Sequence, residues 1–405
     1  MKVLVYEPNL AGHRSHYASL ILPAIEEIGC GVVFATREES IQSQGFKTHL
    51  QDNLGNVTIQ RCKEFSSESI RHEVSRLRHA VTTAQPDHLL VPTAGPLTYP
   101  LFFNTLLGRK PWPDHVRSEG LYFGPGIGYR LESVKKRLLL GVRRKAVEPW
   151  LPWDRYSHVD PFQLAAIANG SDSNRFQLMP DPAPRPGNID SEQARRALGI
   201  PTSGRYCGCS GEISVAKGII DLINAFQTIA DTQELTNDRL LLAGGFEPRV
   251  RKYLEKNCQR LIEDERIICL DRHLTENEMS MVFLSMNLVI AAHQGRPGSS
   301  GIVLRAAAAG RPVLARDKFW TKRIVNEFGL GWTCATWDPE IFAKQLALRL
   351  MDSVEYRQLP ITDRYVRFQS VENFQATWTT LIRQRMGLPQ DDRKLTWNWV
   401  LNGSN

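Results

Sequence analysis

Short apolar runs alternate with longer amphipathic segments along most of the chain. The run "KVLVYEP" near the start is followed by "ASLILPAIEEIG", whose apolar residues recur at helical spacing, and then by a second apolar run, "CGVVFAT". Apolar runs of this length are typical of buried strands, and the spacing between them is typical of helices. Because strands that alternate with helices form parallel sheets covered on both faces, the pattern predicts an α/β protein built from αβα layers.

A proline-rich segment interrupts this alternation near the middle of the chain. Four prolines lie between Pro180 and Pro186, and a second series of strand-like and helix-like segments follows them, beginning with "RYCGCSGEI" and "KGIIDLINAFQTIA". Proline clusters are typical of loops and linkers. We therefore predict two Rossmann-like domains of similar size, over residues 1–180 and 181–364.

Composition narrows the class of protein. Of the 405 residues, 42% are hydrophobic and 23% are charged, a balance typical of globular domains. No stretch of eighteen apolar residues occurs, so we expect no membrane-spanning helix. The N-terminal segment turns polar after five residues, which is too short for a secretory signal. The seven scattered cysteines include no C-x-x-C pair, so we expect no zinc site and no disulfide framework, but reduced thiols in a cytoplasmic protein.

The net charge of +7 favours anionic partners. Nucleic acid is not expected among them, because the basic residues are not interleaved with the aromatic side chains that a stacking platform requires. In residues 133–153, two basic triplets flank an apolar centre. This segment can attach the protein to the inner face of an anionic membrane, or it can form a solvated surface helix whose lysine and arginine stems cover apolar atoms.

The segment "HQGRPGSSGIVLRAAAAGRPVLA", residues 293–315, combines a glycine- and serine-rich turn with a helix and a strand. Ser299 or Ser300 can cap a helix that begins near Gly301, and Gly298 and Gly301 let a ligand approach the backbone. The first N–H groups of a helix have no partner inside it, and together with the helix dipole they favour a phosphate. The segment therefore predicts either an anion site or a capped turn without a ligand.

Polar residues also follow other strands in the second half of the chain. Lys217 stands after a strand in "GEISVAKG" and can reach the same phosphate. Arg272 and His273 end a strand in "LDRHLTENE", where Thr275 followed by Glu278 predicts a helix start with a capping box. Ligands of parallel sheets bind at the carboxyl ends of the strands, so with two such domains these residues predict a site in the cleft between them.

The order of these segments resembles the retaining glycosyltransferases of family 4, most closely from about Arg195 to Leu350. "SVAKG" is similar to that family's diphosphate-binding loop, "RIICLDRHLTENE" to its base-binding loop, and "GSSGIVLRAAAAGRPVLA" to its signature helix. "EPNLAGHRSHYASLI" stands where the family has a glycine-rich first loop. The resemblance implies the GT-B fold, in which two Rossmann-like αβα domains face a central cleft. It also implies a closing helix over residues 365–388, which crosses back to the N-terminal domain, and leaves a tail over 389–405.

The resemblance further implies a reaction. A sugar would move from a nucleotide-activated donor with retention, without a metal ion and without a cofactor other than the donor. The acceptor (a glycan, a lipid or a protein) and the sugar and base of the donor are left open. Catalytic roles would fall on His13, Lys217 and Arg305. The residues expected to bind the donor are Gly12, Glu212, Arg272, His273, His293, Gly298, Ser299, Ser300 and Gly301.

Three positions depart from the pattern of family 4. Its signature helix carries two glutamates, the first for the donor sugar and the second for the nucleotide ribose, where this chain has Pro297 and Arg305. Glu212 replaces an arginine of the diphosphate loop. One hypothesis is a charge exchange, in which Arg305 and Glu212 face each other or the same ligand and Arg305 acts as a bidentate phosphate clamp. The other hypothesis is loss of activity, which leaves a glycosyltransferase-like binding or scaffold protein.

Overall fold

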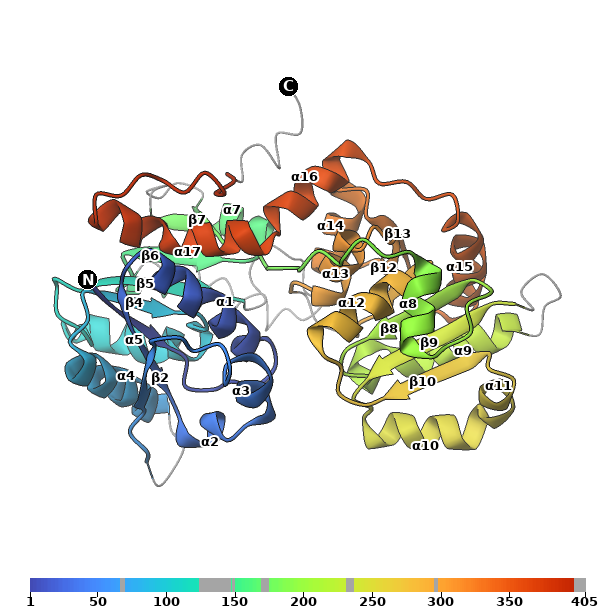
Figure 1. Ribbon diagram of the computed structural model, residues 1–405, viewed down its shortest axis with the longest axis horizontal. Coiled ribbons are helices and arrows are strands. Elements are labelled where there is room, and N and C mark those ends of the chain that lie inside the picture. The colour runs from blue at the N-terminus through green and yellow to red at the C-terminus, as the bar shows by residue number, and fades with distance from the viewer. Residues whose placement is uncertain are drawn as a thin grey trace. The chain divides into compact units, whose positions relative to one another are not determined.

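The computed structural model divides into two compact units, each built on a parallel sheet (Figure 1). Unit 1 comprises Met1–Pro180 together with Val371–Leu395, and unit 2 is formed mainly by Asp181–Ser370. The structure describes residues 1–65, 70–123, 147, 150–168, 175–230, 237–294 and 298–396. Most of the basic segment 133–153 and the position of Pro297 therefore lie outside the described residues.

Unit 1 contains a seven-stranded sheet with the strand order β3-β2-β1-β4-β5-β6-β7. Each strand pairs with its neighbours in parallel. The strands are β1 (Lys2–Tyr6), β2 (Gly31–Thr36), β3 (Thr58–Arg61), β4 (His88–Val91), β5 (Arg117–Tyr122), β6 (Arg155–His158) and β7 (Phe176–Leu178). In this order the connections run in opposite directions on either side of β1 and β4. In doubly wound sheets, the carboxyl ends of two such strands form a crevice that binds ligands.

The two faces of the unit 1 sheet are covered by different helices. Val3 and Val5 of β1 pack with one apolar cluster, whereas Leu4 and Tyr6 pack with another, as the alternation of side chains along a strand requires. The helices of this unit are α1 (His13–Glu27), α2 (Glu38–Ile41), α3 (Gln44–His49), α4 (Ile70–Ala84), α5 (Thr98–Leu106), α7 (Pro161–Ala168) and α17 (Val371–Arg385).

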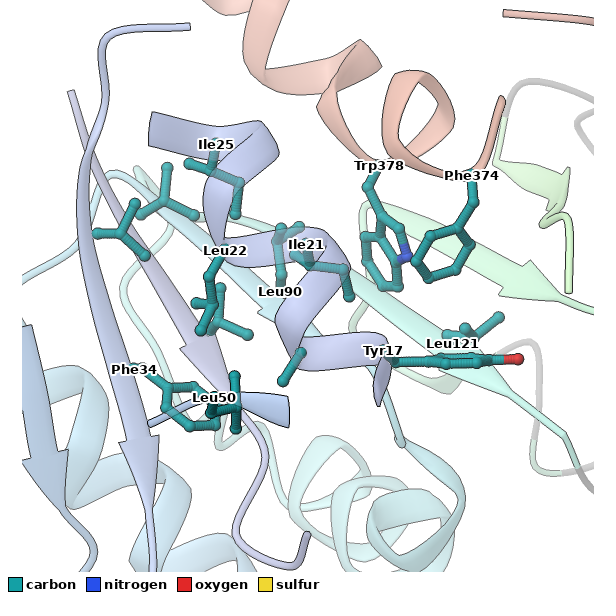
Figure 2. Close-up of a cluster of buried hydrophobic side chains, with 14 of the residues drawn as sticks. Tyr17, Ile21, Leu22, Ile25, Phe34, Leu50, Leu90, Leu121, Phe374 and Trp378 are labelled. Atoms are coloured by element: carbon teal, nitrogen blue, oxygen red, sulfur yellow. The ribbon is translucent and has the colours of Figure 1, made fainter. Parts of the chain in front are cut away.

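Helix α17 supplies a large part of the core of unit 1, although it comes from the far end of the chain. Its fully buried Phe374 and Trp378 point toward α1, where the rings of Phe374 and Tyr17 lie 5.0 Å apart between centroids (Figure 2). Ile21 and Ile25 of α1 belong to the same cluster. Two buried aromatic side chains of this size bury enough apolar surface to fix α17 in unit 1.

The segment expected as one closing helix over residues 365–388 is divided between two helices. Helix α16 (Pro360–Phe368) ends before Gln369, and α17 begins at Val371. The carbonyl of Gln369 accepts a hydrogen bond from Ala183 N (2.9 Å), and its side-chain oxygen accepts one from Asp181 N (2.7 Å). Because N–H groups of the proline-rich linker donate to the backbone and side-chain oxygens of Gln369, helix α16 ends at this point.

Unit 2 contains a six-stranded sheet with the order β10-β9-β8-β11-β12-β13, also parallel throughout. The strands are β8 (Tyr206–Ser210), β9 (Arg239–Gly244), β10 (Ile267–Asp271), β11 (Leu288–Ala291), β12 (Val313–Arg316) and β13 (Gly331–Cys334). The helices include α8 (Ser191–Leu198), α9 (Ile219–Ala230), α10 (Pro248–Asn257), α11 (Gln259–Glu263), α12 (Glu276–Ser285), α13 (Gly301–Ala308), α14 (Phe319–Glu327) and α15 (Pro339–Asp352). The two parallel sheets confirm the predicted α/β architecture. Among the described residues, each helix is too short or too polar to span a bilayer.

Candidate functional site

The carboxyl ends of β8 and β11 form the candidate site of unit 2. These strands are neighbours, and the strand order turns between them, so the loops that follow them leave in opposite directions. Lys217 stands in the loop after β8, and Ser299 and Ser300 stand between β11 and α13. This turning point of a parallel sheet is where doubly wound proteins bind ligands.

The loop after β8 is held by contacts with the end of β9. Glu247 accepts a hydrogen bond from Val215 N (2.9 Å) and donates its own N–H to Ile213 O (2.9 Å). Lys217 closes a short 3-10 turn over Val215–Lys217, and its half-buried side chain folds back so that Nζ lies 3.4 Å from Ser210 O. The ammonium group of Lys217 thus lies at the carboxyl end of β8.

Backbone contacts join this loop to the segment that follows β11. Gln294 N donates to Ala216 O (2.8 Å), and Gly218 adopts a left-handed conformation with φ of +72°. A Cβ atom at Gly218 would lie 2.5 Å from Ala292 O, so only glycine permits this approach. Lys217 and the half-buried His293 are therefore brought together at two adjacent strand ends.

The start of α13 differs from the expected serine cap. Ser300 is the N-cap residue, but its side chain makes no capping hydrogen bond, and within the described part of the chain its buried hydroxyl has no partner. Ser299 Oγ instead donates to Asp181 Oδ2 (2.6 Å). The prediction of a side-chain cap was wrong, because the Ser299 hydroxyl donates to Asp181 of the linker and the Ser300 hydroxyl forms no hydrogen bond with the helix amides. The first N–H groups of α13 consequently keep their capacity to bind an anion.

Glycine leaves space at this helix start. A Cβ atom at Gly301 would meet no heavy atom within 4 Å, and Gly301 is exposed. The half-buried Gly298 precedes the two serines. At Gly301 there is therefore space for a ligand to approach the backbone, as the sequence predicted.

Arg305 pairs with Glu276 and not with Glu212. Its Nη1 lies 2.9 Å from Glu276 Oε2, and its Nη2 donates to Oε1 at 3.1 Å. Glu276 is the first residue of α12, whereas Glu212 is an exposed residue of the turn after β8. Side chains of a helix lean toward its N-terminus, which directs Arg305 to the start of the neighbouring α12. The direct pairing between Arg305 and Glu212 offered by the charge-exchange hypothesis is therefore corrected.

Arg272 and His273 lie two strands away from β8, at the end of the edge strand β10. Arg272 Nη1 forms an ion pair with Glu278 Oε1 (2.6 Å), and His273 is exposed. Glu278 also closes the predicted capping box with Thr275, which the structure confirms. Hydrogen bonds from the Thr275 backbone and from Arg272 lower the pKa of Glu278 despite opposing desolvation. Arg272 and His273 thus lie at the same carboxyl edge of the sheet as Lys217 but, among the described residues, do not contact it.

In unit 1, Gly12 and His13 begin helix α1 after the loop that follows β1. Gly12 has φ of +66°, a conformation that favours glycine, although a Cβ atom there would meet no other atom within 4 Å. The exposed His13 ring packs 4.8 Å from Phe123 and 5.1 Å from Tyr17 between centroids. His13 thus stands at the crevice of the unit 1 sheet.

Glu7 is a residue of this crevice that the sequence analysis missed. It follows β1 directly, its side chain is 1% exposed, and Arg14 Nη1 lies 3.7 Å from its Oε1. Burial raises the pKa of Glu7 to about 7, and the neighbouring Thr93 hydroxyl and Arg14 charge reduce the shift without cancelling it. The available signal was a glutamate placed directly after an apolar strand in "KVLVYE".

Comparisons with known proteins agree with this architecture. Residues 204–352 match the family model of glycosyl transferases group 1. A D-inositol 3-phosphate glycosyltransferase of Corynebacterium urealyticum is 25% identical over 194 residues, which cover 47% of this chain and 43% of that protein. The match thus spans less than half the length of this curated relative.

Two solved structures are similar over nearly their whole length. Sucrose-phosphate synthase from Thermosynechococcus elongatus has a TM-score of 0.67 at 16% identity, covering 96% of this chain and 99% of that one. Anabaena Alr3699/HepE in complex with UDP has a TM-score of 0.63 at 14% identity, covering 96% and 100%. The fold therefore defines a protein of the GT-B class. Within this chain, the match to the glycosyl transferases group 1 family lies in unit 2, over residues 204–352.

Proposed function

We propose that the protein is a glycosyltransferase that moves a sugar from a nucleotide-activated donor to an acceptor. The observation that carries the proposal is the start of α13, where the buried Ser300 hydroxyl lacks a partner among the described residues and the helix amides have no side-chain cap. Lys217 stands at the adjacent strand end. An uncapped helix start beside a lysine suits a diphosphate, and the group 1 family match supports the class of reaction.

The leaving group of the proposed reaction is a nucleoside diphosphate. It gains negative charge as the bond between the sugar and the diphosphate oxygen breaks. The α13 amides and the Ser300 hydroxyl donate hydrogen bonds to it, and Lys217 adds a positive charge. Contacts of Gly218 and Gln294 hold the loop after β8 against the end of β11, which positions Lys217 before the reaction. We propose retention and independence of metal ions on the resemblance to family 4.

Arg305 and Glu276 together could replace the second signature glutamate of family 4, which binds the donor ribose. Arg305 occupies the position whose glutamate binds the ribose in family 4, and its guanidinium holds the carboxylate of Glu276 at 2.9 Å. We propose that Glu276 accepts the hydrogen bonds of the donor ribose and that Arg305 positions it. His293, at the end of β11, is proposed to contact the sugar. Arg272 and His273, at the end of β10, are proposed for the base.

His13 and Gly12 are proposed to act from unit 1. The exposed His13 ring stands at the start of α1, where its packing against Tyr17 and Phe123 limits its orientation. We propose that it contacts the acceptor or the donor phosphate. The proposal names no acceptor, because the family match lies within unit 2.

A second candidate function is a catalytically inactive binding or scaffold protein. The observation that favours it is the Arg305–Glu276 ion pair, which neutralises the cation expected to clamp a phosphate. Nucleoside diphosphate binding without donor cleavage would be the signature of this alternative.

The membrane contact predicted for residues 133–153 lies mostly outside the described residues, but an exposed apolar face elsewhere in unit 1 offers a second membrane-binding surface. Tyr99, Phe103, Leu106 and Leu107 on and just after α5 are 45%, 59%, 52% and 69% exposed. Their spacing places them on one side of the helix, and the exposed Arg109 follows them. Aromatic and leucine side chains bordered by a basic residue suit the interface of an anionic bilayer. We propose peripheral attachment through this face.

The direct test is release of nucleoside diphosphate from a panel of nucleotide sugars by the full-length protein. Lys217→Ala is expected to lower the rate at least about 100-fold, the usual effect of removing one group that stabilises developing charge. Lys252→Ala, an exposed lysine of α10, is the matched control and should leave the rate unchanged. Binding of a diphosphate without its release from any donor would favour the scaffold alternative.

A further inference from the structure

Unit 1 contains a pocket of about 610 Å³ at the amino ends of its strands. Arg117 and Arg155 are the first residues of β5 and β6, and Arg385 is the last residue of α17, and all three line the pocket. Parallel strands all begin at one edge of their sheet. The pocket therefore lies at the edge opposite to the crevice that contains Glu7 and His13, and it is separate from the proposed reaction.

The two carboxylates of this pocket are already engaged. Asp154 Oδ1 pairs with Arg117 Nη1 (2.6 Å), and its Oδ2 accepts hydrogen bonds from Ser118 N and Ser118 Oγ, both at 2.9 Å. Burial alone would raise the pKa of Asp154, but these hydrogen bonds outweigh it and lower the pKa. Asp114 is fully exposed and lies 3.5 Å from Lys110. Among the described residues, neither carboxylate forms an ion pair with Arg155 or Arg385, although Arg385 Nη1 donates to the Asp87 carbonyl.

Arg155 has a donor without an acceptor. Its Nη1 is buried, and among the residues that the structure describes it has no hydrogen-bond partner. Glu119 is paired with Arg155 in the strand register, but its Oε1 is bound by Ser157 Oγ at 3.3 Å. Burial raises the pKa of Glu119 to about 7, and the nearby charge of Arg155 opposes this rise without forming a hydrogen bond to Glu119 among the described residues. Buried guanidinium donors are normally satisfied, which makes the orphaned Nη1 a sign of a missing acceptor.

The charges of the pocket arginines act on two buried bases nearby. Burial, with the added charge of Arg385, lowers the pKa of His88 to about 3. Burial and the charge of Arg155 also lower the pKa of Lys394. Burial is the larger cause of both shifts, and the arginine charges act in the same direction. An anion in the pocket would relieve this repulsion.

We propose that this pocket binds a small molecule that carries a phosphate monoester. The phosphate would take its hydrogen bonds from Arg155 and Arg385, with Arg117 and His115 at the rim, because guanidinium groups bind phosphate oxygens in pairs. The volume exceeds that of a phosphate and lies in the range of pockets for small molecules, so the ester has room for an organic group. The proposal is independent of the proposed glycosyl transfer.

The test is calorimetric titration of the full-length protein with sn-glycerol 3-phosphate at constant ionic strength. We expect saturable binding to the wild type and affinity at least tenfold weaker in Arg155→Gln. Lys217→Ala, which removes the cation of the other anion site, and Arg357→Gln, an exposed arginine of unit 2, should bind like the wild type. Unchanged affinity in Arg155→Gln, or loss in Lys217→Ala instead, would overturn the proposal.

Two additions keep this test decisive. If Arg155→Gln does not fold, as judged by its melting curve, the exposed Arg385→Gln takes its place with the same expectation. Sedimentation with phosphatidic acid vesicles, compared with phosphatidylcholine vesicles, separates a lipid headgroup from a soluble ester as the source of the phosphate. Arginine-dependent binding in either arm supports the site and names its source, and absence of binding in both arms rejects it.

Discussion

Arg305 holds the carboxylate of Glu276 through two contacts, at 2.9 and 3.1 Å, and thereby joins the start of α12 to α13. In the resemblance to family 4, Arg305 stands at the position of the second signature glutamate. We propose that Glu276, a carboxylate supplied by α12, takes the role at the donor ribose that this glutamate would have.

Glu276→Gln should separate binding of ribose from binding of phosphate. We expect the affinity for a nucleoside diphosphate to fall about tenfold, the effect of one hydrogen bond of about 1.4 kcal/mol. The affinity for inorganic pyrophosphate should not change, because it has no ribose. Stability should change by no more than about 1 kcal/mol, since the pair is partly exposed. Titration with both ligands measures this, and an equal loss for both would contradict the role of Glu276.

Ser300→Ala should have opposite effects on the free and the liganded protein. Without ligand, removal of a buried hydroxyl that lacks a partner should leave the free energy of unfolding unchanged or raise it by up to about 1 kcal/mol. With a diphosphate, the stabilisation by the ligand should be smaller than in the wild type. Ser299→Ala is the matched control. It loses the hydrogen bond to Asp181, so it should destabilise the free protein by about 1.5–3 kcal/mol. Urea unfolding with and without pyrophosphate distinguishes the two serines.

Glu7→Gln should make the stability of the protein less dependent on pH. The pKa of Glu7 is raised from 4.5 to about 7, so between these values the folded state binds a proton that the unfolded chain has lost. The contribution of Glu7 to stability is therefore present below about pH 4.5 and is lost as the pH rises to 7. A shift of this size corresponds to about 3 kcal/mol. The variant should be more stable than the wild type at pH 8 by up to about 3 kcal/mol and similar to it at pH 4.5. Urea unfolding at both pH values measures this, and a variant less stable at pH 8 would contradict the account.

Replacing the apolar face of α5 should weaken membrane binding without unfolding the protein. The double variant Phe103→Ser, Leu107→Ser removes two side chains that are more than half exposed, so its melting temperature should stay close to that of the wild type. Binding to vesicles with anionic lipid should decrease several-fold in a sedimentation assay. Val354→Ser, an exposed position of unit 2, should bind like the wild type. Equal sedimentation of all three proteins would reject attachment through this face.

The fold was predictable from the sequence because its signals are local. Apolar runs such as "KVLVY" predict buried strands, and the spacing of Thr275 and Glu278 alone predicts a capped helix start. The break at Gln369 was not predictable, since it depends on hydrogen bonds from Asp181 and Ala183, which are far away in the sequence.

The placement of Lys217 and Ser300 at strand ends was predictable from the sequence, but the contacts of the candidate residues were not. Lys217 and Ser300 each follow a segment that the sequence pattern predicts to be a parallel strand. Because parallel strands end at one edge of a sheet, their shared edge could be inferred. The partner of Arg305 depends on how α12 packs against α13, and the burial of Glu7 depends on the side chains that surround the end of β1. Such contacts between distant segments leave no periodic signal in the sequence.

The measurement that tests the central proposal most directly is thermal stabilisation by a panel of nucleoside diphosphates and nucleotide sugars. It compares the wild type with Lys217→Ala and with the control Lys252→Ala. We predict a rise in melting temperature with the diphosphate of one base, retained in the control and lost in Lys217→Ala, because a ligand that binds only the folded state stabilises it. Stabilisation by none of the compounds, or equal stabilisation of Lys217→Ala, would contradict a donor site at the start of α13.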